Sequence, residues 1–139
     1  MRNRPTVLLR LGLLGTILAV GQPAHAESWS TLYSDSEISV SYDSDSLEQT
    51  PEGTMMVSWR TTFAVAQYPD PDSSISETTP FYTRQQYIEI DCASQILWIW
   101  GVWYLDYSGQ VLGGSEGEGP AVTIRSGTVA ELLSRQVCG

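Results

Sequence analysis

Apolar and polar side chains are patterned most clearly between Tyr87 and Gly113. Residues 87–92 alternate, which is the period of a half-buried strand. After a short turn at residues 93–95, residues 96–105 are apolar on both faces, as expected of a central strand covered on two sides. A second turn at Ser108-Gly109 leads into a short strand. We therefore predict a three-stranded meander, and the inward positions of its first strand are Ile88, Ile90 and Cys92.

The segments before this meander also have the pattern of strands. Residues 55–66 alternate over their whole length and predict one long strand, with Met55, Val57, Trp59, Thr61, Phe63 and Val65 on one face. Residues 28–33 and 38–42 predict two shorter strands. The cluster Asp43 to Ser46 favours a turn or a single helical turn. Residues 69–80 contain three prolines and predict an exposed loop.

The end of the chain has the pattern of a helix. Residues 113–119 are acidic and rich in glycine, so we expect a flexible connection there. Thr128 and Glu131 then form a T-x-x-E capping box, which is typical of a helix start. The apolar stripe of this helix consists of Val129, Leu132, Leu133 and Val137. Strands followed by one helix predict an α+β fold, with an antiparallel meander of about six strands and the C-terminal helix packed on it.

Residues 1–26 read as a signal peptide. A basic start is followed by an apolar run over residues 11–20 and by Ala24-His25-Ala26, a small-residue cleavage site. The apolar run is about half the length that spans a bilayer. We expect cleavage after Ala26, which leaves residues 27–139 as one exported domain in the periplasm or outside the cell. With no cysteine near the cleavage site, no lipid anchor is predicted.

Removal of the signal peptide makes the chain strongly acidic. The full chain has a formal charge of -9, and residues 27–139 keep all 16 acids but only four arginines, so their charge is 4 minus 16, or -12. Such a surface repels nucleic acid and anionic membranes. It favours solubility or a basic partner.

The composition offers few side chains that could act in catalysis. The chain has no lysine, and its only histidine, His25, lies in the signal peptide. Two carboxylates would suffice for a glycosidase, but spacing singles out no pair, so we predict neither an enzyme nor a cofactor. Asp70, Asp72 and Ser74 have the spacing that starts a calcium loop. The later glycine and glutamate are replaced by Ile75 and Phe81, so we predict no metal site.

Two cysteines in an exported chain are read most simply as one disulfide, here between Cys92 and Cys138. Such a bond would join the end of the helix to the first corner of the meander. A redox-active pair would need the close spacing of a C-x-x-C motif, which is missing.

Short motifs along residues 27–139 resemble the surface-adhesin protein E family. They are Trp29, Tyr42-Asp43, Ser46-Leu47, Val57, Trp59, Glu89, Asp91, Cys92, Tyr107, Gly109, Val111, Ser126, Glu131, Leu132 and Val137-Cys138. The resemblance implies a small antiparallel sheet with a flanking helix, a cysteine pair, attachment to the bacterial surface and adhesion to host matrix proteins. The chain departs from the family in lacking a lipid-bearing cysteine after its signal.

A second departure is a run of aromatic side chains in the strand after Cys92. By alternation, Trp98, Trp100 and Tyr104 would share one face and Trp103 the other. These side chains either form core under the helix and the first strands, or leave one face free for a homodimer, a peptide or a sugar. We expect an exported binding module that contacts extracellular matrix or itself. The alternatives are a structural envelope protein that acts through homodimerisation and a carboxylate-based hydrolase.

Overall fold

The computed structural model describes residues 27–73 and 75–139. The predicted signal peptide, residues 1–26, lies outside the described residues. The elements are β1 (Trp29–Ser34), β2 (Ile38–Gln49), β3 (Met55–Gln67), β4 (Phe81–Asp91), β5 (Ile96–Leu105), β6 (Val111–Glu116), β7 (Ala121–Thr123) and α2 (Val129–Cys138).

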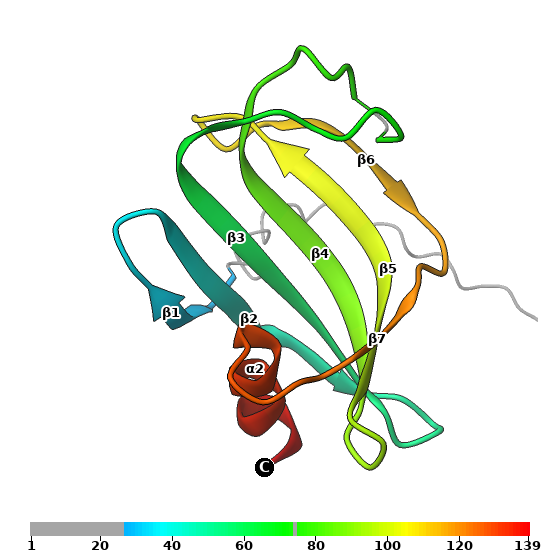
Figure 1. The fold of residues 1–139 in the computed structure, drawn as a ribbon. Coiled ribbons are helices and arrows are strands. Elements are labelled where there is room, and N and C mark those ends of the chain that lie inside the picture. The colour runs from blue at the N-terminus through cyan, green and yellow to red at the C-terminus, as the bar shows by residue number, and fades with distance from the viewer. Residues whose placement is uncertain (1–26, 74) are drawn as a thin grey trace, which may run out of the picture.

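The strands form one antiparallel sheet in the order β1-β2-β3-β4-β5-β6, and β7 pairs with β5. Every neighbour in this order is also the next strand along the chain, so the sheet is a meander. One end of β5 pairs with β6 and the other end, Ile96 to Trp98, pairs with β7. Figure 1 shows the sheet as a twisted, curved layer with α2 against one end of it. The predicted α+β fold with a single C-terminal helix is confirmed.

The predicted turn at Asp43 to Ser46 is wrong, because β2 continues through it. The pairing of β2 with β3 shifts between Asp43 and Glu48, and side chains replace the missing backbone bonds. Asp43 Oδ1 accepts from the backbone N–H of Ser28 (2.9 Å). Ser46 Oγ accepts from the backbone N–H of Ser58 (2.8 Å). The polar cluster therefore stays extended by bonding to its neighbours.

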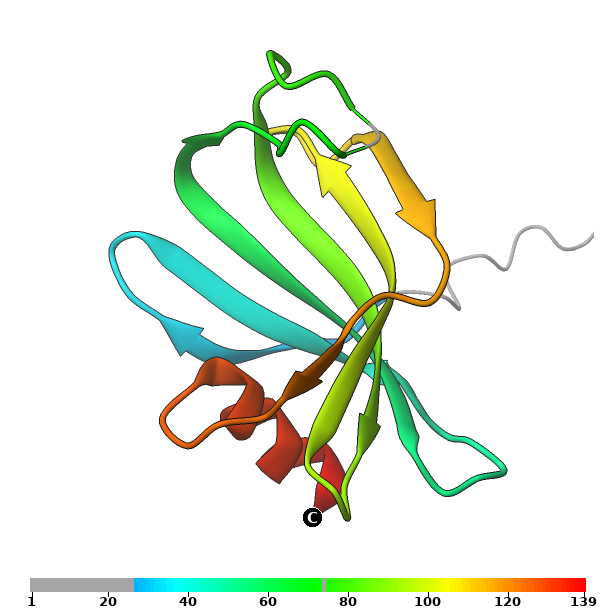
Figure 2. The same ribbon diagram turned by 45° about the vertical axis from the view of Figure 1, so that its right-hand side comes forward.

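The predicted connection at residues 113–119 is also wrong in its first half. Strand β6 runs to Glu116 because Gly114 pairs with Trp103 and Glu116 pairs with Gly101 of β5. Glycine normally weakens a strand, but here it leaves room for a tryptophan ring from the neighbouring strand. Figure 2 shows β6 at the edge of the sheet, with the chain then crossing to β7 and α2.

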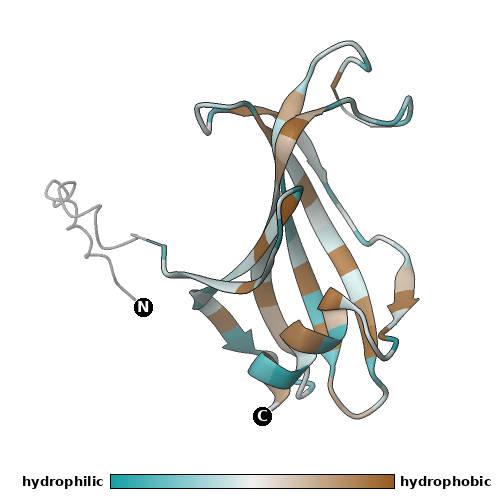
Figure 3. Cartoon of the chain, turned by 60° about the vertical axis from the view of Figure 1, so that its left-hand side comes forward, coloured by the Kyte–Doolittle hydropathy of each residue, from teal (hydrophilic) through white to brown (hydrophobic). Residues whose placement is uncertain are grey.

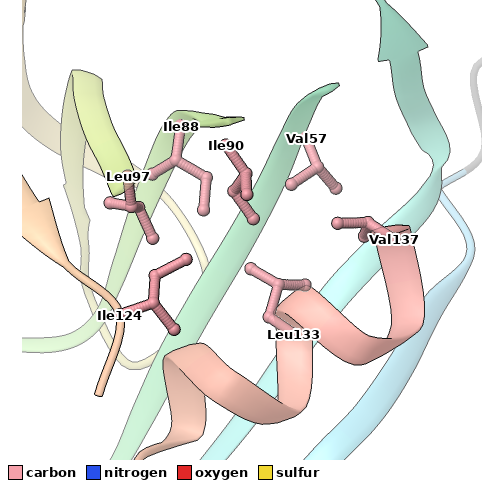
Figure 4. Packing of buried hydrophobic residues seen from close by; sticks show 7 residues of the cluster. All are labelled: Val57, Ile88, Ile90, Leu97, Ile124, Leu133 and Val137. Carbon is pink, nitrogen blue, oxygen red and sulfur yellow. The ribbon is translucent and has the colours of Figure 1, made fainter. Parts of the chain in front are cut away.

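The core lies between α2 and one face of the sheet. Val57, Ile88, Ile90 and Leu133 are completely buried, and Figure 4 shows the helix placing Leu133 and Val137 over the strands. Burying one such side chain contributes about 1.5–3 kcal/mol. The inward positions predicted for β4 are confirmed, as are Val57 of β3 and Leu133 and Val137 of the helix. The prediction is wrong for Val65, which is 68% exposed, and for Val129 and Leu132, which lie outside the core cluster. Apolar residues recur along the strands in Figure 3, as this packing requires.

Both ends of α2 are fixed as the sequence predicted. Thr128 Oγ1 accepts from the backbone N–H of Glu131 (3.2 Å), and Glu131 Oε1 accepts from that of Gly127 (3.0 Å). At the other end, Cys138 is bonded to Cys92, with the two Cα atoms 5.7 Å apart. The predicted disulfide is confirmed, and it joins the helix to the turn between β4 and β5.

Candidate binding groove

The face of the sheet opposite α2 has no element packed on it among the described residues; we call it the open face. Directly paired residues of neighbouring strands project to the same side of a sheet. Ile88 and Ile90 point to the helix, so Tyr87 and Glu89 of β4 lie on the open face. Tyr87 pairs with Ser58, and Glu89 pairs with Met56. The expectation that β5 is covered on two sides is therefore wrong for the described part of the chain, because α2 covers only one face.

A β-bulge in β5 decides where its aromatic side chains lie. Tyr87 pairs with Gly101 and Ile88 pairs with Ile99, which leaves Trp100 as an extra residue. Because of this extra residue, each side chain after the bulge lies on the face opposite to the one that strict alternation predicts. The three tryptophans Trp98, Trp100 and Trp103 therefore share the open face with Glu89, and Tyr104 lies on the other face. The predicted partition, with Trp103 apart from the other two, is wrong because strict alternation does not allow for an inserted residue.

Two glycines leave space for the ring of Trp103 against the backbone of the sheet. A Cβ atom on Gly101 would overlap Trp103 Cη2 and lie 2.7 Å from Cζ3, and one on Gly114 would overlap Trp103 Cδ1. The indole therefore lies against the backbone of both β5 and β6. This contact covers two positions that carry no side chain of their own.

Two adjoining hollows, of about 370 and 360 Å³, lie along the open face around Tyr87 and Trp103, which line both. We call them together the open-face groove. Its lining is mostly aromatic and aliphatic, and comprises Met56, Ser58, Gln85, Tyr87, Trp100, Trp103, Leu105, Val111, Glu116 and Gly117. A concave apolar surface with a few polar groups is the usual form of a binding site.

Hydrogen bonds fix a carboxylate beside this groove. Trp100 Nε1 donates to Glu89 Oε1 (2.8 Å), and Thr54 Oγ1 donates to Glu89 Oε2 (2.5 Å). Thr54 Oγ1 is in turn 2.6 Å from Thr50 Oγ1. These bonds hold both Trp100 and Glu89 in one arrangement, so the groove has a charged group with a fixed position.

Tyr87 lies at the centre of the groove in a negative environment. Its partial burial raises the pKa of its hydroxyl, and the nearby carboxylate of Glu48 raises it further. Both effects disfavour a second negative charge at this point. Tyr87 therefore stays neutral at physiological pH and presents an aromatic ring and a hydroxyl to the groove.

The structure brings together only some of the predicted binding residues. Trp100 and Trp103 line the groove, whereas Trp98 lies on the open face outside its lining and opposite Glu89. Tyr104 packs edge-on against Phe81, with ring centroids 4.7 Å apart. It belongs to an aromatic cluster, shared with Phe63, at the end of the sheet away from the helix.

Several groove residues were missed, above all Tyr87, Met56 and Gln85. The alternation from Tyr87 to Cys92 places Tyr87 and Glu89 on the face away from the core, and this was the available signal. The predicted short strand after Ser108-Gly109 contains Val111, but Glu116 could not have been found, because residues 113–116 do not have the pattern of a strand.

The described residues do not bring acids together in a way that indicates hydrolysis or metal binding. Among the residues described, Asp43 is the one buried acid, and it accepts backbone N–H groups of Ser28 and Asp45. No group of three or more potential metal ligands occurs within residues 27–73 and 75–139. In the same residues, no helix is both long and apolar enough to cross a bilayer.

The fold and groove define a small disulfide-linked sheet domain with a candidate binding face. Solved structures of Haemophilus influenzae protein E are similar to it. Crystal form II shares 13% identity at a TM-score of 0.56, covering 71% of this chain and 79% of that one. Another structure of protein E shares 15% identity at a TM-score of 0.54, covering 71% and 76%. No family model and no curated protein matches the chain. The likeness supports the resemblance to protein E and concerns the fold.

Proposed function

We propose that this chain is an exported binding module that holds a protein partner through the open-face groove. The observation that carries the proposal is the aromatic groove on a sheet face that no described element covers. Half-exposed tryptophans in a hollow are the kind of residue that contributes most to protein interfaces. The resemblance to the surface-adhesin protein E family supports host matrix proteins as the partners.

The proposal includes export of the domain. Residues 1–26 act as the signal peptide and are removed after Ala26, leaving residues 27–139. The disulfide supports this proposal, because such bonds persist in oxidising compartments such as the periplasm and the cell exterior.

The test is binding of the exported, oxidised protein to a panel of purified host matrix proteins. Its mass is checked first for the loss of residues 1–26. Saturable binding to a panel member should be weakened about tenfold or more by Trp100→Ala, since interface tryptophans commonly contribute 2 kcal/mol or more. Tyr68→Ala removes another exposed aromatic side chain, 63% accessible and outside the groove, and should leave binding unchanged.

Equal binding by the wild type and a folded Trp100→Ala variant would contradict the role of the groove. A second possible partner is another copy of the chain, because the same face is free for it. Dimerisation that depends on concentration and is lost in Trp100→Ala, without binding to any matrix protein, would favour the structural envelope protein.

A further inference from the structure

Carboxylates surround the aromatic part of the open-face groove on three strands. Glu48 of β2 pairs with Met56, and Met56 pairs with Glu89 of β4, so both acids lie on the open face at one end of the groove. Glu116 of β6 pairs with Gly101 and lines the groove at its β6 side. The aromatic rings of Tyr87, Trp100 and Trp103 lie among these three acids.

No basic side chain of the described residues neutralises them. Arg60 lies on the open face opposite Gln85, but its guanidinium lies over the ring of Trp29, 4.0 Å from the ring centroid, toward the β1 edge of the sheet. Arg84 lies on the opposite face, 5.8 Å from the ring of Phe63. Arg135 pairs with Glu131 on the helix. The remaining arginine, Arg125, lies between β7 and the helix.

Aromatic faces and carboxylates together attract a cation. The faces of tryptophan and tyrosine rings carry a partial negative charge and bind ammonium and guanidinium groups, more strongly where water is excluded. Glu89 adds a formal charge whose position is fixed by Trp100 and Thr54. The ring faces and the carboxylate would both stabilise a bound cation, and the site would not have to rearrange to bind it.

We propose that the open-face groove binds an arginine or lysine side chain of a basic segment of a partner protein, with Trp100 and Trp103 against the side chain and Glu89 and Glu116 as its counter-charges. This inference rests on the proposed function and adds the chemistry of the partner. The overall charge favours a basic partner over a second copy, because two domains of charge 4 minus 16, or -12, repel one another.

The test uses two blocked peptides of equal length, titrated into the exported, oxidised protein at physiological ionic strength. One alternates arginine with glycine, and the other alternates citrulline with glycine, which keeps the shape of arginine and removes its charge. The arginine peptide should bind at least about tenfold more tightly, as expected when a charged partner of fixed carboxylates is lost. Trp100→Ala should weaken its binding by about threefold or more.

A matched pair of charge variants separates the groove from the overall charge. Glu116→Gln removes one acid from the groove and should weaken binding of the arginine peptide about threefold or more. Glu77→Gln removes the same charge from the exposed loop before β4 and should leave it nearly unchanged. Equal effects of the two variants would overturn the proposal, because affinity would then follow net charge alone.

Two other outcomes overturn the inference in different ways. The first is that the protein binds the citrulline and arginine peptides with equal affinity, while Trp100→Ala still weakens binding to matrix proteins. The groove would then bind proteins through apolar contacts, and the proposed function would survive. If the arginine peptide does not bind and the protein dimerises through Trp100, the occupant of the groove is a second copy of the chain. If neither Trp100→Ala nor Glu116→Gln weakens binding to matrix proteins, the proposed function is overturned as well.

Discussion

Single residues decide the shape of the open face. The ring of Trp103 reaches its position because Gly101 and Gly114 have no side chains beneath it. The extra residue Trp100 turns toward Glu89 and forms a hydrogen bond with it. The groove therefore depends on two glycines and one bulge as much as on its aromatic side chains.

Gly101→Ala is predicted to lower the free energy of unfolding by about 1–3 kcal/mol, because the new methyl group overlaps the ring of Trp103. In a Trp103→Leu background the same substitution should cost much less, since the overlapping atoms are gone. Gly114→Ala should remain costly in that background, because its Cβ would also lie 2.5 Å from the backbone oxygen of Val102. Urea unfolding of the variants measures these differences, and a cost of Gly101→Ala that is equal in both backgrounds would refute the contact.

Specific bonds fix both ends of α2. Thr128 and Glu131 satisfy backbone N–H groups at its start, and its last residue forms the disulfide. Along its length, Ser134 Oγ donates to Gln95 Oε1 (3.1 Å), which connects the helix to the turn between β4 and β5. The helix is thereby held over the core at three points.

The cap of α2 should make stability depend on pH. The hydrogen bond from the Gly127 N–H, and then the charge of Arg135, hold the pKa of Glu131 below its ordinary value of 4.5. The folded pKa is the lower one, so the carboxylate stabilises the fold above the unfolded pKa, and this is lost as pH falls through the folded pKa. Glu131→Gln should therefore show a shallower fall in the free energy of unfolding below about pH 4.5. Denaturant unfolding at several pH values tests this, and identical slopes would count against it.

At the scale of the whole molecule, one cross-link holds together a small and strongly acidic domain. The disulfide joins residues 46 apart and closes the loop that contains β5, β6, β7 and α2. Repulsion between the acids opposes compaction, and within residues 27–73 and 75–139 a helix covers only one face of the sheet. We therefore expect the cross-link to contribute a large part of the free energy of unfolding.

Reduction of the disulfide, or the double substitution Cys92→Ser and Cys138→Ser, is predicted to lower the free energy of unfolding by about 4 kcal/mol. This is the chain-entropy estimate for a closed loop of 46 plus 1, or 47, residues. Thermal unfolding with and without reductant measures the loss. A change below about 1 kcal/mol would show that the helix is held by its packing and cap alone.

The sequence by itself determined the elements whose side-chain period is regular. The alternation in β3 and β4, the capping box and apolar stripe of α2, and the two cysteines were enough to predict the fold class, the core and the disulfide. Each of these signals comes from nearby residues, or from the only possible pairing of two cysteines.

Only the tertiary structure decided the elements that depend on pairing between distant strands. Strand β6 continues to Glu116 because its backbone bonds to β5, and β2 continues through a polar cluster because Ser28 and Ser58 bond to it. The bulge at Trp100 comes from the register between β4 and β5 and reverses which face the aromatic side chains occupy. One inserted residue moves every following side chain to the other face, so the groove could not be read from alternation along a single strand.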